Sequence, residues 1–174
     1  MVVSLDEGSG AGKSTLAAEV ASHVEATVIP CDEFFDATIT DEEWDSYTSE
    51  QKCRRCIDWK RVRREVLLPL LTGENAQYHP FSFYTENELA TSLVTKEPSM
   101  IIILDGIYSS LPEMSDVIDF KILVEVSSEV SRYRHNVREG HEDEDWHLCW
   151  DPAEDYYFSA LCPPASFDLI VVNQ

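Results

Sequence analysis

The stretch that decides the fold is Leu5-Asp6-Glu7-Gly8-Ser9-Gly10-Ala11-Gly12-Lys13-Ser14-Thr15. The apolar residues at and before its start predict a buried strand, and residues 13–24 predict a helix. A glycine-rich turn between strand and helix, closed by Gly-Lys-Ser-Thr, is typical of a phosphate-binding P-loop, whose backbone N–H groups and helix N-terminus attract an anion. We therefore expect residues 8–15 to bind a nucleoside triphosphate, with Lys13 on its β- and γ-phosphates and Ser14 on Mg²⁺.

Glu7 departs from the usual P-loop pattern, which has glycine five residues before Gly12. Either its carboxylate lies near the phosphates and repels them, or it points outward and Gly8 supplies the flexibility of the turn. The sequence leaves these two arrangements open, and with them the strength of nucleotide binding.

The composition excludes several classes of protein. The 33 acidic and 13 basic residues give a net charge of −20, whereas a nucleic-acid partner requires a basic surface. No stretch approaches the roughly 20 apolar residues of a membrane span, and no basic segment precedes the first strand as in a signal peptide. The five cysteines are an odd number, which fits a reducing compartment. We expect a cytoplasmic protein that acts on a small molecule.

Short apolar strands alternate with helical stretches, which predicts an α/β protein with a parallel sheet in a single domain, residues 1–174. The expected strands are Val2–Leu5, Ala26–Ile29, Met100–Leu104, Phe120–Val124 and Leu169–Val172, and the expected helices are Lys13–Val24, Glu50–Leu71, Ser128–Arg138 and Ala153–Leu161. Residues 76–95 predict a hairpin or an irregular insertion, interrupted at Thr85-Glu86-Asn87.

Two acidic residues follow predicted strands. Because ligands of an open parallel sheet bind beyond the carboxyl ends of its strands, Asp32 is expected on the same rim as the P-loop. There it can accept the proton of an attacking hydroxyl, although an aspartate at this position also caps a helix well. Asp105 ends an apolar strand and is followed by Gly106, which is the form of a Walker B strand whose carboxylate helps to hold Mg²⁺.

Taken together, these residues resemble the uridine kinase and phosphoribulokinase family of P-loop kinases. The resemblance rests on residues 6–15, on Cys31-Asp32-Glu33-Phe34-Phe35, on Asp58-Trp59-Lys60-Arg61-Val62 with Leu68-Pro69-Leu70, on Leu104-Asp105-Gly106-Ile107, and on residues 153–158 and 167–171. It implies the P-loop NTPase fold, with a five-stranded parallel sheet, helices on both faces and a small lid over the phosphates. It also implies ATP and Mg²⁺ as cofactors, Asp32 as the base, and Ser14 with Asp105 at the metal.

In such kinases the lid brings arginines onto the transferring phosphates. Here the lid region is expected at 132–150, and the candidates are Arg134 and Arg138, whose spacing puts both on one helical face. A solvated helix that pairs with nearby acids explains the same spacing equally well. Five acidic residues follow the arginines and would repel a triphosphate, which favours their facing solvent: Glu139, Glu142, Asp143, Glu144 and Asp145.

The residues expected to contact the acceptor are Asp32, Phe35, Tyr78, His79 and Phe81. Uridine kinases carry Tyr-Asp-Phe and a following histidine against the nucleoside, whereas this chain has Phe81-Ser82-Phe83 and no histidine after it. His79 or Tyr78 can take over that role. Fewer polar contacts relax discrimination between acceptors, because unpaired buried groups are what reject a wrong substrate.

The cysteine and histidine patterns favour structural roles over a metal site. Cys53 and Cys56 form a CxxC without a second pair and lie in a predicted helix. The spacing of His141, His147 and Cys149 fits no standard metal site.

Charged and aromatic patterns likewise favour structural roles. The basic residues between positions 54 and 64 favour a solvated helix face or partners for acids over a nucleic-acid patch. Trp146 and Trp150, four residues apart, favour core packing over a stacking platform.

The sequence therefore favours an ATP- and Mg²⁺-dependent kinase that phosphorylates a hydroxyl group of a small metabolite, with a nucleoside as the favoured acceptor. One alternative is another small-molecule kinase on this scaffold, for gluconate, pantothenate or dephospho-coenzyme A. The other is a nucleotide-binding module with little turnover, which Glu7 and the acidic lid favour.

Overall fold

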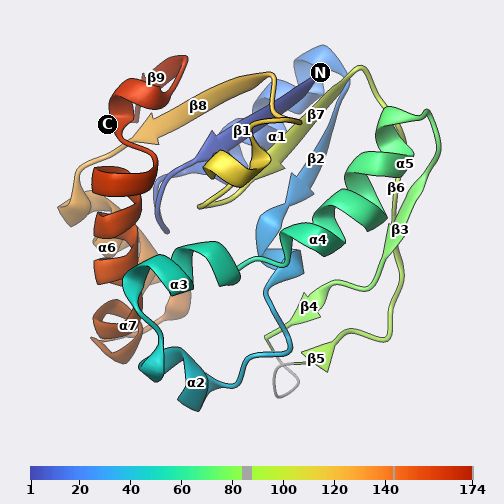
Figure 1. Cartoon of the computed structure of the whole chain (residues 1–174). Helices are drawn as coiled ribbons and strands as arrows, with labels where there is room; N and C mark the ends of the chain where they lie inside the picture. Colours follow the sequence, from blue (N-terminus) through green and yellow to red (C-terminus); the bar gives the residue numbers. More distant parts are fainter. Residues whose placement is uncertain (84–87, 143, 174) are drawn as a thin grey trace.

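The computed structural model describes residues 1–83, 88–142 and 144–173, and its centre is one parallel sheet (Figure 1). Five strands form it in the order β2–β7–β1–β8–β9. Their bounds are β1 Val2–Asp6, β2 Ala26–Pro30, β7 Ile101–Asp105, β8 Phe120–Glu125 and β9 Leu169–Val172. The predicted α/β class and all five predicted strands are confirmed, with ends that shift by one residue at most.

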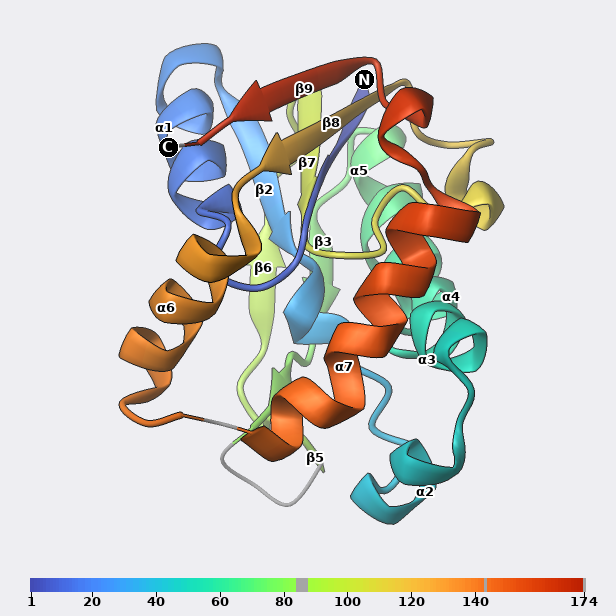
Figure 2. The same cartoon turned by 90° about the vertical axis from the view of Figure 1, so that its left-hand side faces the viewer.

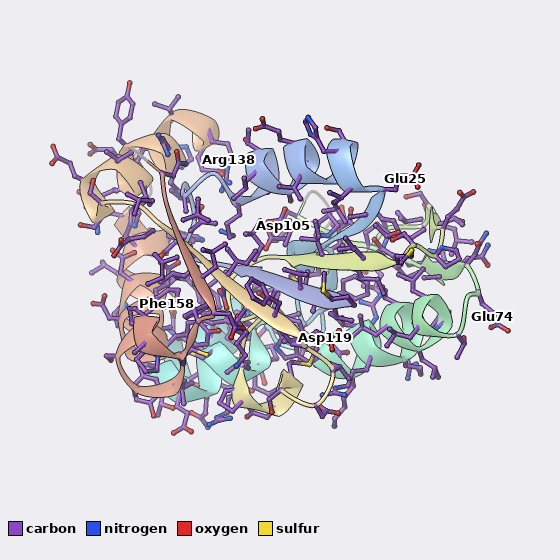
Figure 3. All side chains as sticks on the ribbon, turned by 90° about the horizontal axis from the view of Figure 1, so that it is seen from above. Glu25, Glu74, Asp105, Asp119, Arg138 and Phe158 are labelled. Carbon is purple, nitrogen blue, oxygen red and sulfur yellow. The ribbon has the colours of Figure 1, made fainter. Side chains whose placement is uncertain are left out.

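Helices cover both faces of the sheet (Figure 3). Helix α1 (Lys13–Val24) packs on one face, where Leu5 and Ile103 contact the buried Ala17. On the other face, Ile102 and Leu104 pack in the main core with residues of the segment 49–71. Successive side chains of a strand point to opposite faces, so a sheet covered on both sides needs apolar residues at nearly every strand position. The continuous run at 101–104 meets that need.

The prediction of one helix over residues 50–71 is wrong, because the segment is interrupted at Cys56–Asp58. Helix α3 (Ser49–Arg55) ends there, and Ile57 forms a β-bridge with Phe35. The side chain of Asp58 then accepts hydrogen bonds from the N–H groups of Lys60 and Arg61, at 3.1 Å each, and starts a new helix. That helix runs through α4 (Trp59–Arg61), a π-helical turn (Val62–Leu67) and α5 (Leu68–Leu71).

The last predicted helix begins earlier than expected. Helix α7 spans Glu144–Tyr156 and continues as a π-helical turn, Tyr157–Leu161. Pro152 lies inside α7, and since proline usually stands in the first turn of a helix, the sequence predicted a start beside it. Helix α6 (Ser128–Glu139) is found where it was predicted. Figure 2 shows α6 and α7 next to each other below the sheet.

Residues 76–96 form two small antiparallel ladders, so of the two predicted alternatives, a hairpin or an irregular insertion, the structure shows the hairpin. Strand β3 (Ala76–Tyr78) pairs with β6 (Val94–Lys96), and β4 (Phe81–Ser82) pairs with β5 (Glu88–Leu89). The predicted interruption at Thr85-Glu86-Asn87 lies outside the described residues. The shorter elements are α2 (Asp41–Ser46) and 3₁₀ turns at Cys31–Phe34, Pro112–Met114 and Pro164–Ser166.

The five arginines between positions 54 and 64 form ion pairs with acids of the same chain, as one of the two interpretations predicted for this basic stretch. Arg55 pairs with Asp36 at 3.0 Å and Arg63 pairs with Asp116 at 2.5 Å. Arg54 pairs with Glu50 and Glu113, while Arg61 and Arg64 pair with Glu65.

Cys53 and Cys56 are buried free thiols, and burial raises the pKa of each thiol above its usual value. Within residues 1–83, 88–142 and 144–173, no group of three metal-ligating side chains is present. No helix in the same ranges is long and apolar enough to cross a membrane.

Replacing Asp58 with alanine is expected to destabilise the protein by about 1 kcal/mol, because two backbone N–H groups lose their cap. Urea unfolding followed by circular dichroism measures the change. Asp45→Ala, on the exposed side of α2, is the control and should leave the midpoint unchanged. Equal midpoints for the two variants would contradict the role assigned to Asp58.

Candidate active site

The P-loop connects β1 to α1, as the sequence predicts. Gly10 and Gly12 have φ angles of 81° and 90°, in the left-handed region that favours glycine. The Lys13 Nζ donates a hydrogen bond to the Gly8 carbonyl oxygen at 2.8 Å, so its ammonium group lies over the start of the loop. The loop therefore gathers backbone N–H groups and one lysine at the N-terminal end of α1.

Asp6 anchors the end of β1 just before this loop. Its carboxylate accepts hydrogen bonds from the N–H groups of Tyr108 (3.0 Å) and Ser110 (2.9 Å) and from the Tyr157 hydroxyl (2.5 Å). Asp6 is fully buried, and this burial raises the pKa of its carboxyl, while the bonds from Tyr157 and Ser110 and the charge of Lys13 lower it. Sequence reasoning missed this role, since the partners lie about 100 and 150 residues away.

Asp105 lies where a metal ligand was expected. It is the last residue of β7. Figure 3 shows it near the start of α1, whereas Glu25 lies at the other end of that helix. It is 6% exposed, and within the described part of the chain its Oδ1 has no hydrogen-bond partner. Burial raises the pKa of this carboxyl, whereas a hydrogen bond with the Ser14 side chain and the charge of Lys13 lower it.

The pair of Asp105 and Ser14 fits Mg²⁺. This ion prefers oxygen ligands, and it is commonly held by one or two protein oxygens, with phosphates and water completing its shell. A buried carboxylate oxygen without a partner, next to a hydroxyl group, meets that requirement.

Asp32 lies on the same rim. Strands β2 and β7 are neighbours with Pro30 opposite Asp105, so the two carboxylates follow adjacent strand ends. The charge of Asp32 raises the pKa of Asp105, which reflects this proximity. The 3₁₀ turn that contains Asp32 has no side-chain cap, so its exposed carboxylate is not used as a helix cap.

Helix α6 reaches the P-loop through Arg138 and His135. The Arg138 Nη2 donates to the Ser9 hydroxyl at 3.0 Å, and His135 Nδ1 lies 2.8 Å from the same oxygen. Gly10 permits the close approach, because a Cβ there would collide with the carbonyl oxygen of Ser131. The side chain of Arg134 forms no hydrogen bond or ion pair with another residue of the described ranges. Figure 3 shows Arg138 near the start of α1.

The acids after Arg138 pair with it or face solvent. Glu139 pairs with Arg138 at 2.9 Å, while Glu142, Glu144 and Asp145 are exposed. The expectation for Asp143 lies outside the described residues.

Residues 2–142 match the sequence profile of the phosphoribulokinase / uridine kinase family. The chain belongs to this family. A uridine kinase from Halobacterium salinarum is 28% identical over 136 residues, which are 76% of this chain and 59% of the relative. A uridine kinase from Chlamydia pneumoniae is 27% identical over 153 residues, which are 83% of this chain and 66% of the relative. This chain thus spans less than two thirds of the length of either relative.

Solved structures share the family fold. A structure described as that of a possible uridine kinase from Bacillus stearothermophilus superposes with a TM-score of 0.71 at 16% identity, over 98% of this chain and 88% of that one. D-glycerate 3-kinase from Cryptococcus neoformans gives a TM-score of 0.54 at 11% identity, over 88% of this chain and 77% of that one. At such low identities the likeness concerns the fold alone, and it confirms the P-loop kinase architecture.

Aromatic side chains pack around Phe35, one of the residues expected to contact the acceptor. The ring of Phe35 lies 5.1 Å from that of Phe81, 5.5 Å from that of Trp44 and 6.0 Å from that of Trp150. Trp44 and Trp150 are themselves 5.2 Å apart, so Trp150 packs in a cluster as predicted. Trp146 instead stacks on His135 at 4.3 Å.

Tyr78 and His79 are engaged in contacts that hold the insertion. Tyr78 is 2% exposed, and its hydroxyl donates to the carboxylate of Glu33. The Nδ1 of His79 lies 3.0 Å from the carbonyl oxygen of Ala90 and 3.1 Å from that of Ser92. Tyr78 thus ties the insertion to the 3₁₀ turn of Glu33, and His79 ties two segments of the insertion together.

Two glutamates lie on the P-loop, and the sequence pointed to only one of them. Glu7 folds back, so that its Oε1 accepts a hydrogen bond from the Gly8 N–H at 3.0 Å, and burial raises its pKa. Glu154 comes from α7, and its Oε2 would collide with a Cβ at Gly8. Burial raises the pKa of Glu154 to about 8, although the charge of Lys13 and a hydrogen bond from the Ser9 N–H lower it.

A cavity of about 310 Å³ lies beside the contacts that join the P-loop to α6 and α7. It lies between Ser9 of the loop, Arg132 and His135 of α6, and Trp146, Asp151 and Glu154 of α7. Most of the side chains around it are charged or polar.

Tyr157→Phe is expected to destabilise the protein by about 1–3 kcal/mol, because the buried carboxylate of Asp6 loses a donor. Tyr156→Phe is a matched control, since its hydroxyl bonds to Glu50 at the surface at 3.3 Å. Urea unfolding at neutral pH measures both changes. The same loss of stability in both variants would contradict the role of Asp6 as an anchor.

Proposed function

We propose that this protein transfers the γ-phosphoryl group of ATP to a hydroxyl group of a small metabolite, with Mg²⁺ as cofactor. The observation that carries the proposal is the convergence of four groups at one sheet edge: the Lys13 ammonium, the Ser14 hydroxyl, and the carboxylates of Asp105 and Asp32. A triphosphate, a metal and an acceptor hydroxyl each find a suitable partner among them.

The P-loop holds the polyphosphate in this proposal. The backbone N–H groups of residues 8–15 and the Lys13 ammonium bind its oxygens, and Ser14 with Asp105 hold the metal. When bound, Mg²⁺ neutralises charge on the β- and γ-phosphate oxygens. Lys13 then exchanges its bond to the Gly8 carbonyl for one to a phosphate oxygen.

Asp32 is the proposed base. Its exposed carboxylate accepts the proton of the acceptor hydroxyl as the oxygen attacks the γ-phosphorus. Arg138, which already reaches the Ser9 hydroxyl, stabilises the charge that develops on the transferring group. Arg134 is the second candidate, one helical turn earlier on the same face of α6.

The favoured acceptor is a nucleoside or a related sugar-bearing compound. Two observations support this choice. The relatives are described as uridine kinases, and the partly exposed Phe35, whose N–H donates to the Asp32 carbonyl oxygen at 3.2 Å, offers a ring surface on which a base can pack. Tyr78 and His79 then act by holding the insertion that places Phe81 against this ring.

A second candidate is a nucleotide-binding module with little turnover. The two glutamates on the loop, Glu7 and Glu154, favour it, because their negative charge opposes that of a triphosphate.

The substitution Asp32→Asn separates the two candidates. For a kinase, we expect turnover to fall by about 10²–10⁴-fold, the usual contribution of a general base, while the affinity for MgATP stays the same. ADP release over a panel of nucleosides and sugars measures turnover, and calorimetry measures affinity. Asp45→Asn is the control for the loss of one surface charge.

Lys13→Ala should lose both activity and affinity. Activity that survives this substitution unchanged would mean that the site lies elsewhere. A wild-type protein that binds MgATP and phosphorylates nothing in the panel would favour the binding module instead.

A further inference from the structure

Glu154 is the side chain of α7 that lies directly on the P-loop, and its contacts suggest a control on nucleotide entry. Its Oε2 lies so close to Gly8 that any side chain there would collide with it, and its carboxyl accepts a hydrogen bond from the Ser9 N–H. The Lys13 ammonium binds the Gly8 carbonyl on the same stretch of loop. The carboxyl group thus lies where Lys13 would meet the end of a bound triphosphate.

The surroundings of Glu154 contain more negative than positive charge. The negative charges of Glu7 and Asp151 raise the pKa of Glu154, and the positive charge of Lys13 lowers it. Arg132, His135, His147 and Asp155 line the cavity beside Glu154. On the core side, the charge of Glu154 raises the pKa of Cys53, Cys56 and Tyr108. Arg132 pairs with Asp151, and Nδ1 of His147 lies 2.9 Å from the same carboxylate, so both side chains already have an acidic partner.

A carboxyl group in this position has opposite effects in its two protonation states. When ionised, it takes the Ser9 N–H as a hydrogen-bond donor and repels an approaching phosphate in a place where water screens little. When neutral, it carries no repulsive charge, and its O–H can donate to a phosphate oxygen. The effect of glutamate at this position therefore depends on pH, whereas a glutamine side chain is neutral and can donate a hydrogen bond at any pH.

We propose that Glu154 gates the phosphate site, admitting a nucleoside polyphosphate when its carboxyl is neutral and opposing it when ionised. This inference rests on the proposed nucleotide binding and adds to it a regulating residue outside the P-loop. The pKa of about 8 for Glu154 puts the change near neutral pH. Because a bound triphosphate favours the neutral form, affinity should be highest below pH 8 and fall as the pH rises through that value.

The test is calorimetric titration of the whole chain with MgATP, without acceptor, at pH 7 and pH 9. If only the neutral form binds, the dissociation constant of the wild-type protein should rise about tenfold between these values. Glu154→Gln should hold a nearly constant affinity, changing by less than about twofold, because it cannot ionise. The matched control is Glu144→Gln, an exposed acid at the start of the same helix, which should behave like the wild type.

A second measurement needs no substitution. When wild-type protein binds MgATP at pH 8, it should take up about half a proton, which titrations in buffers of different ionisation enthalpy report. The inference is overturned if binding takes up no proton, or if Glu154→Gln loses affinity with pH as strongly as the wild type. A wild-type protein that binds no MgATP at either pH would instead overturn the proposed function, and the gate with it.

Discussion

Three neighbouring parallel strands, β2, β7 and β1, end at the same edge of the sheet, and the site depends on this constraint. Parallel strands deliver whatever follows their carboxyl ends to one place. Here that is Asp32 after β2, Asp105 at the end of β7 and the P-loop after β1. The buried carboxylate of Asp6, the last residue of β1, then binds the segment after β7 and the π-helical turn after α7, so the loop starts from a fixed point.

Several carboxyl groups lie around the P-loop, and their negative charge opposes the binding of a triphosphate. Lys13 is the cation that the P-loop itself provides, while Glu7 and Glu154 lie on the loop and Asp105 lies beside it. Burial raises the pKa of all three carboxyls, which lessens their repulsion of a phosphate. The backbone N–H groups of the loop and the Arg138 guanidinium supply further positive potential at this site, in a chain whose net charge is −20.

Much of this was accessible from the sequence, since the deciding signals are local. The P-loop, the five strands and the acid at the end of β7 each occupy a few consecutive residues. The break near Asp58 was missed because its flanks have helical periodicity and only the cap reveals the new start. Spacing alone could not separate Arg134 from Arg138, which share a helix face. Glu154 was missed because its contact with Gly8 depends on how α7 packs, some 146 residues along the chain.

The central claim is that the backbone N–H groups of the P-loop bind a polyphosphate. Amide chemical shifts in ¹H–¹⁵N spectra during titration with MgATP test it most directly. The account predicts that the largest shifts occur in residues 8–15 and that Lys13→Ala suppresses them. Shifts that leave these amides unchanged and gather elsewhere, for example around the Phe35 cluster, would contradict it.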